Sequence, residues 1–93
     1  MCGFVGGTEP FWDYHAAVES ITHRGPDASK LHLKAPIRVG FRRLSIIDLG
    51  EWANQPMFAR DGSTWIVFNG EIYGFRSVRK DLEKRGHVFR TQS

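Results

Sequence analysis

The sequence predicts an α+β domain whose strands are mostly antiparallel. Two segments repeat apolar residues at helical spacing, while several shorter segments alternate apolar and polar residues between turn residues. The predicted order is a strand, a helix, a group of paired strands and a late helix, which differs from the regular alternation that builds a parallel sheet. At 93 residues and 41% hydrophobic content, the chain suffices for one small domain with a packed core.

The N-terminal part predicts a strand followed by a helix. Phe4 and Val5 form the centre of the opening strand. Apolar residues over residues 11–21 recur at the three- and four-residue spacing of one helix face. Thr8 is the expected N-cap of this helix, and the Gly-Pro pair at 25–26 is its expected stop.

Two antiparallel strands are expected next. Residues 31–34 and 37–41 each alternate apolar with polar residues, and an Ala-Pro break separates them. Residues 42–48 have a mixed periodicity, so we expect them to leave the edge of the sheet as a loop. Turn-forming Gly, Asn and Pro residues continue this loop through residues 49–56.

A hairpin and a second helix follow. Residues 57–58 and 65–68 flank an Asp-Gly pair at 61–62, which is a strong hairpin signal. Phe, Val and Leu at helical spacing predict a helix over residues 75–82, with Gly86 as its stop.

The last residues predict the start of a further strand over residues 87–91. The chain then stops at Ser93 without a closing helix or cap. We therefore expect residues 1–93 to be the N-terminal portion of a larger domain.

Composition excludes several function classes. The net charge is +3, but the 13 Lys and Arg are interleaved with 10 acidic residues and form no basic block, which argues against nucleic-acid binding. One cysteine allows no internal disulfide and suits a reducing compartment, so the cytoplasm is expected. The sequence shows neither a leader nor a run of membrane-spanning length, so no membrane partner is expected. Its four histidines lack metal-ligand spacing, so no metal site is predicted.

Cys2 is the first candidate for chemistry. It directly follows Met1, and removal of Met1 by an aminopeptidase would place a thiol and a free α-amine on one residue. Their ordinary pKa values, about 8.5 and about 7.7–8.0, are close enough for proton exchange near neutral pH. One residue would then supply both nucleophile and general base. The structural alternative is a small buried residue on the first strand.

Two arginine-containing motifs form the second group of candidates. His-Arg-Gly-Pro-Asp at residues 23–27 combines a turn with Arg24 and Asp27, which are suited to holding the loop by charge-assisted hydrogen bonds. Arg-Arg-Leu-Ser-Ile-Ile-Asp at residues 42–48 places paired arginines before an irregular stretch, where a guanidinium fork can grip a carboxylate. The alternative for this pair is a solvated charge on an edge strand.

The third motif is Phe-Asn-Gly-Glu-Ile-Tyr at residues 68–73. Asn-Gly between apolar runs is typical of a type I′ hairpin turn. The functional alternative uses the side-chain amide of Asn69 and the backbone N–H of Gly70 as donors to a developing oxyanion.

Together with the N-terminal Met-Cys-Gly, these motifs resemble the class II glutamine amidotransferases, whose glutaminase domain is an N-terminal-nucleophile hydrolase. The motifs and the Gln-Pro-Met at residues 55–57 are most similar to those of the glutamine-hydrolysing asparagine synthases. The resemblance covers nearly the whole chain. It implies part of a four-layer αββα sandwich, in which two mostly antiparallel sheets lie between helix layers.

The resemblance also implies residue roles. Cys2 would be the nucleophile and its own amine the base, and Arg43 would bind the α-carboxylate of glutamine. Asn69 and Gly70 would form the oxyanion hole, while Glu71 would help to hold the substrate α-amino group.

The partners implied are glutamine and a C-terminal synthetase domain that uses ATP and Mg²⁺ to activate aspartate, while the glutaminase step needs no cofactor. Two alternatives stay open: an amidotransferase with another acceptor, as in surface-polysaccharide synthesis, or an inactive truncated fragment. We expect the isolated chain to be poorly soluble or inactive, because unpaired sheet edges and uncovered aromatic residues favour aggregation.

Overall fold

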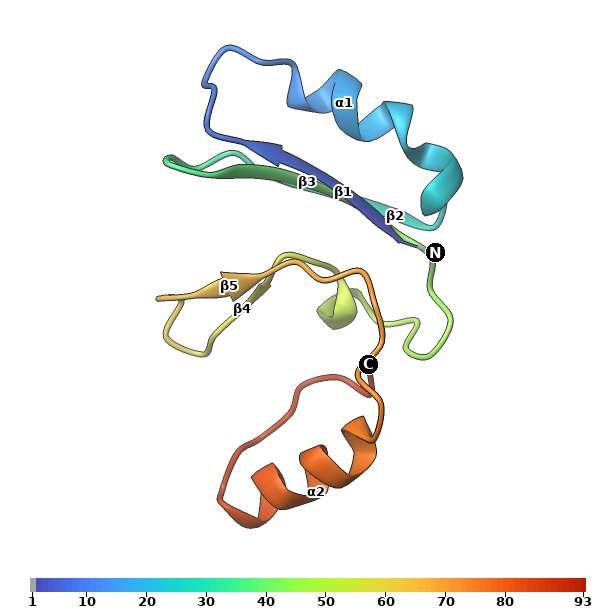
Figure 1. The fold of residues 1–93 in the computed structure, drawn as a ribbon, viewed down its shortest axis with the longest axis vertical. Coiled ribbons are helices and arrows are strands. Elements are labelled where there is room, and N and C mark those ends of the chain that lie inside the picture. The colour runs from blue at the N-terminus through green and yellow to red at the C-terminus, as the bar shows by residue number, and fades with distance from the viewer. Residues whose placement is uncertain (1) are drawn as a thin grey trace.

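The structure is a computed structural model that describes residues 2–93. Its elements lie in the order α1, a three-stranded sheet, a two-stranded sheet and α2 when followed from one end of the molecule to the other (Figure 1). The elements, in chain order, are β1 (Gly3–Gly7), α1 (Tyr14–Ser20), η1 (Thr22–Arg24), β2 (Ala28–His32), β3 (Arg38–Arg43), η2 (Glu51–Ala53), β4 (Met57–Phe58), β5 (Trp65–Ile66) and α2 (Phe75–Lys84). The predicted α+β class with antiparallel sheets is confirmed.

The larger sheet has the strand order β1-β3-β2, with every pair antiparallel. Phe4 of β1 lies opposite Phe41 of β3, and Lys30 of β2 lies opposite the same residue on the other side. Because β3 is paired along both edges, five of its six residues are buried. The prediction that residues 42–48 leave the sheet at an edge is therefore wrong for Arg42 and Arg43, which end the central strand.

One face of this sheet packs against α1. Tyr14 and Val18 of the helix are buried, with 3% and 1% exposed surface. Gly40 lies directly beneath Val18, since a Cβ at this position would come within 2.9 Å of the Val18 Cβ. Side chains alternate along a strand, so Arg42 shares the α1 face with Gly40, while Val39, Phe41 and Arg43 point to the other face.

The opposite face of the sheet meets the β4–β5 hairpin. His32 of β2 contacts the rings of Phe58 and Trp65, with centroid separations of 5.3 and 5.4 Å. Phe58 pairs with Trp65 in the hairpin register, as predicted from the Asp-Gly turn, and Gly62 adopts a φ of +73° there. These contacts pack the hairpin against the larger sheet as a second layer, through residues that lie far apart in sequence.

The first helix begins later than predicted. Asp13 is its N-cap, and the Asp13 side chain accepts a hydrogen bond of 2.9 Å from the backbone N–H of Ala16. Thr8 therefore does not cap the helix, and Phe11 precedes it with 94% of its surface exposed. Gly25 ends the short η1 helix rather than α1 itself.

The predicted strand over residues 87–91 is also wrong. No strand within residues 2–93 pairs with this segment, and side chains from other elements bind its backbone instead. Arg79 of α2 donates a 2.7 Å hydrogen bond to the carbonyl of Thr91 and lies 4.6 Å from the ring centroid of Phe89. By contrast, α2 matches its prediction, and Gly86 follows it with a φ of +92°.

Helix α2 lies beyond the hairpin and leaves a groove of about 1210 Å³ between the hairpin, the loop after β5 and the last residues of the chain. Most of its lining is apolar, including Ile66 and Val88, which are 57% and 77% exposed. Within the described part of the chain, no helix combines the length and apolar character needed to cross a bilayer.

Candidate active site

The thiol of Cys2 lies against the residue that follows β3. Its Sγ accepts a hydrogen bond of 3.3 Å from the Leu44 backbone N–H and lies 3.7 Å from the Leu44 carbonyl, to which it donates. The residue is half-buried and has no disulfide partner. Met1 and its removal lie outside the described residues. The strand pairing of β1 with β3 thus brings the one cysteine onto Leu44, the residue that follows Arg43 in the chain.

The His-Arg-Gly-Pro-Asp motif holds this arrangement from the other side. Arg24 donates through Nε and Nη2 to the Cys2 carbonyl, at 3.4 and 3.3 Å. Asp27 donates its backbone N–H to the Arg43 carbonyl at 3.0 Å, and its Oδ2 accepts from the Ser45 backbone N–H at 2.7 Å. The predicted supporting role of Arg24 and Asp27 therefore has a geometric basis: together they fix the chain on both sides of the thiol.

Arg43 lies at the centre of the following loop, with only 6% of its surface exposed. Its Nη1 donates to the Gly50 carbonyl at 2.7 Å and to Asn54 Oδ1 at 3.0 Å, and its Nη2 donates to the Asp48 carbonyl. An arginine carries five N–H donors. The Nε donor and one Nη2 donor have no partner within residues 2–93, so part of the planar fork is not used by the loop.

The Asn-Gly motif follows β5, in a different segment of the chain from Cys2 and Arg43. Asn69, Gly70 and Glu71 are exposed, and no hydrogen bond or ion pair within residues 2–93 joins them to Cys2 or Arg43. They do not form the type I′ hairpin turn, because that turn needs positive φ angles at both central residues and neither Asn69 nor Gly70 has one. Gly70 and Glu71 instead line the large apolar groove.

The loop that carries these residues is fixed at its start by Gln55. The Gln55 side-chain amide donates to the Phe68 carbonyl at 3.0 Å and accepts from the Phe68 backbone N–H. This pair of hydrogen bonds replaces the strand pairing that β5 loses after Ile66. The polar groups of Asn69 and Gly70 are thus free of the sheet.

Comparison with known proteins identifies the family of this chain. All 93 residues, 1–93, match the glutamine amidotransferase domain family. The chain belongs to this family. The resemblance to glutamine amidotransferases that the motifs of this amidotransferase domain indicated is therefore confirmed.

The relatives that this amidotransferase domain matches include asparagine synthetases described as glutamine-hydrolysing. Asparagine synthetase 1 of Bacillus subtilis (strain 168) is 39% identical over 106 aligned residues, which cover the whole chain and 16% of the relative. The root enzyme of Pisum sativum is 38% identical over 100 residues, again across the whole chain and 17% of the relative. Asparagine synthetase 1 of Lotus japonicus is 41% identical over 73 residues, covering 78% of this chain and 12% of its own length. The chain thus spans about a sixth of the curated relatives that match it throughout.

Sequence reasoning missed several residues that shape the site of this amidotransferase domain. Asp48 and Asn54 hold the loop around Arg43, and Gln55 holds the loop before Asn69. Two of these residues had a signal in the sequence: Asp48 ends the Arg-Arg-Leu-Ser-Ile-Ile-Asp motif, and Gln55 begins the Gln-Pro-Met motif. Asn54 lies in a segment that the sequence predicted only as a loop. Among residues 2–93, no three His, Cys, Asp or Glu side chains are grouped to bind a metal ion.

Proposed function

We propose that this amidotransferase domain hydrolyses glutamine at Cys2 and supplies the ammonia for asparagine synthesis. The observation that carries the proposal is the position of the Cys2 thiol, which lies on the backbone of Leu44, the residue that follows Arg43 in the chain. The proposed nucleophile and the proposed carboxylate-binding group thus come from adjacent ends of the paired strands β1 and β3. Family membership and the synthetase relatives support the same reaction.

In the proposed mechanism, Cys2 becomes the first residue when Met1 is removed. Its α-amine takes the thiol proton, and Sγ bonds to the side-chain amide carbon of glutamine. The C–N bond then breaks, the amide nitrogen leaves as ammonia with the transferred proton, and a γ-glutamyl thioester remains. Water attacks this thioester, which releases glutamate and restores the thiol.

The remaining residues bind the substrate in this proposal. Arg43 binds the α-carboxylate through its Nε and Nη2 donors. Glu71 binds the α-amino group, and Asn69 with Gly70 donates to the oxyanion of the tetrahedral intermediate. Their freedom from strand pairing supports this role, because donors already used in a hairpin would not be available. Glutamine would bridge the Cys2–Arg43 cluster and the Asn69 loop.

The proposal extends to the larger protein. We place residues 1–93 as the N-terminal portion of a glutaminase domain, followed by a synthetase domain that uses ATP and Mg²⁺ to activate aspartate. The order of helix, sheet, sheet and helix in Figure 1 supports a four-layer sandwich of the N-terminal-nucleophile hydrolase type. The glutaminase step itself needs no cofactor, and a free thiol nucleophile suits the cytoplasm.

A different ammonia acceptor is the second candidate. An amidotransferase of surface-polysaccharide synthesis would share the same glutaminase residues. The relatives that the chain matches along its whole length are asparagine synthetases, which favours aspartate as the acceptor.

The test is intact-mass analysis of the chain before and after exposure to an electrophilic glutamine analogue, with free glutamine as competitor. The proposed function predicts loss of the Met1 mass and one adduct on Cys2, suppressed by glutamine, a result that would also overturn the expectation from the sequence that the isolated chain is inactive. Cys2→Ser keeps a small side chain at this position and should take up no adduct. Retention of Met1, or labelling that is indifferent to glutamine, would identify an inactive fragment instead.

A further inference from the structure

Asp48 connects the Arg43 loop to a distant part of the chain. Its carboxylate accepts a hydrogen bond of 2.8 Å from the backbone N–H of Gly50 through Oδ1, and another of 2.8 Å from the backbone N–H of Gln92 through Oδ2. Its carbonyl accepts from Arg43 Nη2. One residue therefore binds the guanidinium, the loop around it and a segment 44 positions away.

Three successive residues, 90–92, form hydrogen bonds with three different parts of the chain. Arg90 donates to the Phe58 carbonyl of β4, and the Thr91 carbonyl accepts from Arg79 of α2. Gln92 is the third, and its partner is Asp48. Thr91 is only 7% exposed. The segment is therefore built into the fold although it forms no strand, and Asp48 is its connection to the active-site loop.

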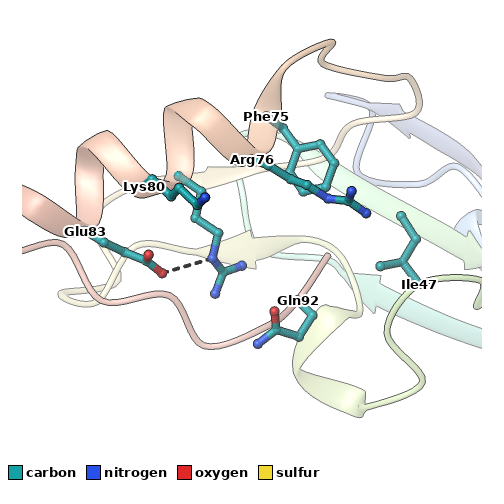
Figure 2. Close-up of a pocket in the computed structure, with 7 residues that line it drawn as sticks. Ile47, Phe75, Arg76, Lys80, Glu83 and Gln92 are labelled. Carbon is teal, nitrogen blue, oxygen red and sulfur yellow. Dashed lines mark hydrogen bonds and ion pairs between the residues drawn. The ribbon is translucent and has the colours of Figure 1, made fainter.

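A pocket lies between this connection and α2. A pocket of about 550 Å³ separates Ile47 and Gln92 from the basic face of α2 (Figure 2). Arg79 of that face is engaged by Glu83 at 3.1 Å, shown by the dashed line in Figure 2. Among residues 2–93, the hydrogen bond from the Gln92 N–H to the Asp48 carboxylate is the one that joins the Arg43 loop to the last residues of the chain.

The charge state of Asp48 agrees with this role. The Gln92 and Gly50 backbone hydrogen bonds, with the nearby Arg43 charge, hold the pKa of the Asp48 carboxyl below its ordinary value. The carboxylate is therefore ionised at neutral pH and available as a double acceptor.

We propose that Asp48 is a positioning residue for glutamine binding, which holds the loop around Arg43 and the Gln92 segment in the geometry that presents the open guanidinium donors to the substrate α-carboxylate. This inference rests on the proposed function. Asp48 does not touch the reacting atoms; it acts through Arg43 and through the loop that surrounds it.

Asp48→Asn tests the proposal because the two side chains have nearly the same shape. The Asn oxygen can still accept one backbone N–H, but its NH₂ group faces the second N–H as a donor and cannot accept from it. Asp61→Asn is the matched control, since Asp61 makes a similar turn with the Ser63 N–H and hydroxyl at the hairpin, away from Arg43. Both variants are examined in the whole 93-residue chain.

Two labelling reactions separate positioning from folding. In Asp48→Asn, the concentration of electrophilic glutamine analogue that gives half the maximal labelling rate should rise about tenfold, the size expected for losing one hydrogen bond to a charged group. The maximal rate, and the rate with iodoacetamide, which carries no α-carboxylate, should not change. Hydrogen exchange at the Gln92 or Gly50 amide should become faster in Asp48→Asn and not in Asp61→Asn.

The possible failures are distinguishable. If the unsubstituted chain is not labelled in a glutamine-selective way, the proposed function fails and this inference fails with it. If the unsubstituted chain is selective and Asp48→Asn has an unchanged half-saturating concentration, only the inference is overturned. Equal slowing with iodoacetamide would also overturn it, since the effect would then lie on the thiol or on folding.

Discussion

Adjacent arginines at the end of β3 stabilise opposite sides of the domain. Arg42 points toward α1, where its Nε donates to the Gly25 carbonyl at 3.0 Å and its Nη1 forms an ion pair of 3.3 Å with Glu19. Arg43 points to the other face and binds the loop that follows β3. Both are buried, and each meets oxygen acceptors, as a buried guanidinium requires. One residue step along the strand thus separates a structural arginine from the candidate substrate-binding arginine.

Asp48 gives a pH-dependent prediction at the same scale. Its pKa in the folded chain is lowered, mainly by the backbone hydrogen bonds from Gln92 and Gly50. A group with a lowered folded pKa adds stability above its unfolded pKa of about 3.9 and loses that contribution as the pH falls through the folded value. We therefore expect the Gln92 amide to lose protection from hydrogen exchange only below about pH 4, measured by NMR at successive pH values.

Two controls make this titration specific. Asp48→Asn should remove the step at Gln92, because no carboxylate remains to titrate. The pKa of Asp61 is also lowered, by Ser63, but its titration should be visible at the Ser63 amide and not at Gln92. A step at Gln92 with its midpoint above the ordinary Asp value would contradict the assignment.

At the scale of elements, the close contact between Gly25 and β3 determines how the first motif reaches the site. A Cβ at Gly25 would lie 2.5 Å from the Arg42 carbonyl carbon and 2.5 Å from the Arg43 backbone nitrogen. Its φ of −157° is ordinary extended backbone, so the need for glycine comes from space alone. This contact places Arg24 next to Cys2 on one side and Asp27 next to Ser45 on the other.

Gly25→Ala should therefore destabilise the fold by about 3 kcal/mol, at the upper end of ordinary overpacking, because the obstructing atoms are backbone of the central strand. The free energy of unfolding in urea, followed by circular dichroism, measures this loss. Gly62→Ala is the control: nothing lies within 4 Å of its Cβ, and its positive φ alone should cost about 1–2 kcal/mol. An equal or smaller loss at Gly25 would contradict the steric argument.

At the scale of the whole molecule, the layers differ in how completely they are packed. The α1 layer and the larger sheet enclose the buried residues Tyr14, Val18 and Gly40. The hairpin layer contacts this sheet through aromatic rings at His32. The last layer, α2, contains no buried residue, and only its first residue, Phe75, lines the apolar groove. Exposed apolar side chains therefore occur at both ends of the molecule, such as Phe11 next to α1 and Val88 in the groove.

The groove should make the chain associate with itself and bind the dye ANS, since large exposed apolar patches favour both. The double variant Ile66→Thr/Val88→Thr makes its lining more polar while it keeps β-branched side chains. We expect weaker dye fluorescence and a lower mean mass in sedimentation at equal chain concentration. Phe11→Ser, at an exposed site outside the groove, should change neither; a similar effect there would show that association does not depend on the groove.

The sequence by itself determined the α+β class, the two helices, the hairpin at Asp61-Gly62 and Cys2 as the candidate nucleophile. Each of these depends on local periodicity, on turn chemistry or on a motif, which are properties of neighbouring residues. The roles of Cys2, Arg43, Asn69, Gly70 and Glu71 remain proposals, and the structure adds where each lies. It places the Cys2 thiol on Leu44, the residue after Arg43, and places Gly70 and Glu71 in the lining of the apolar groove.

Only the tertiary structure decided that Arg42 and Arg43 end a central strand, that residues 87–91 form no strand, and that Asp48 binds Gln92. The physical reason is that these features depend on partners far away in sequence. A strand is central only if two other strands pair with it, and a strand-like segment forms no strand where no other strand pairs with it. A carboxylate that binds a backbone N–H 44 residues away leaves no periodic signal in the sequence.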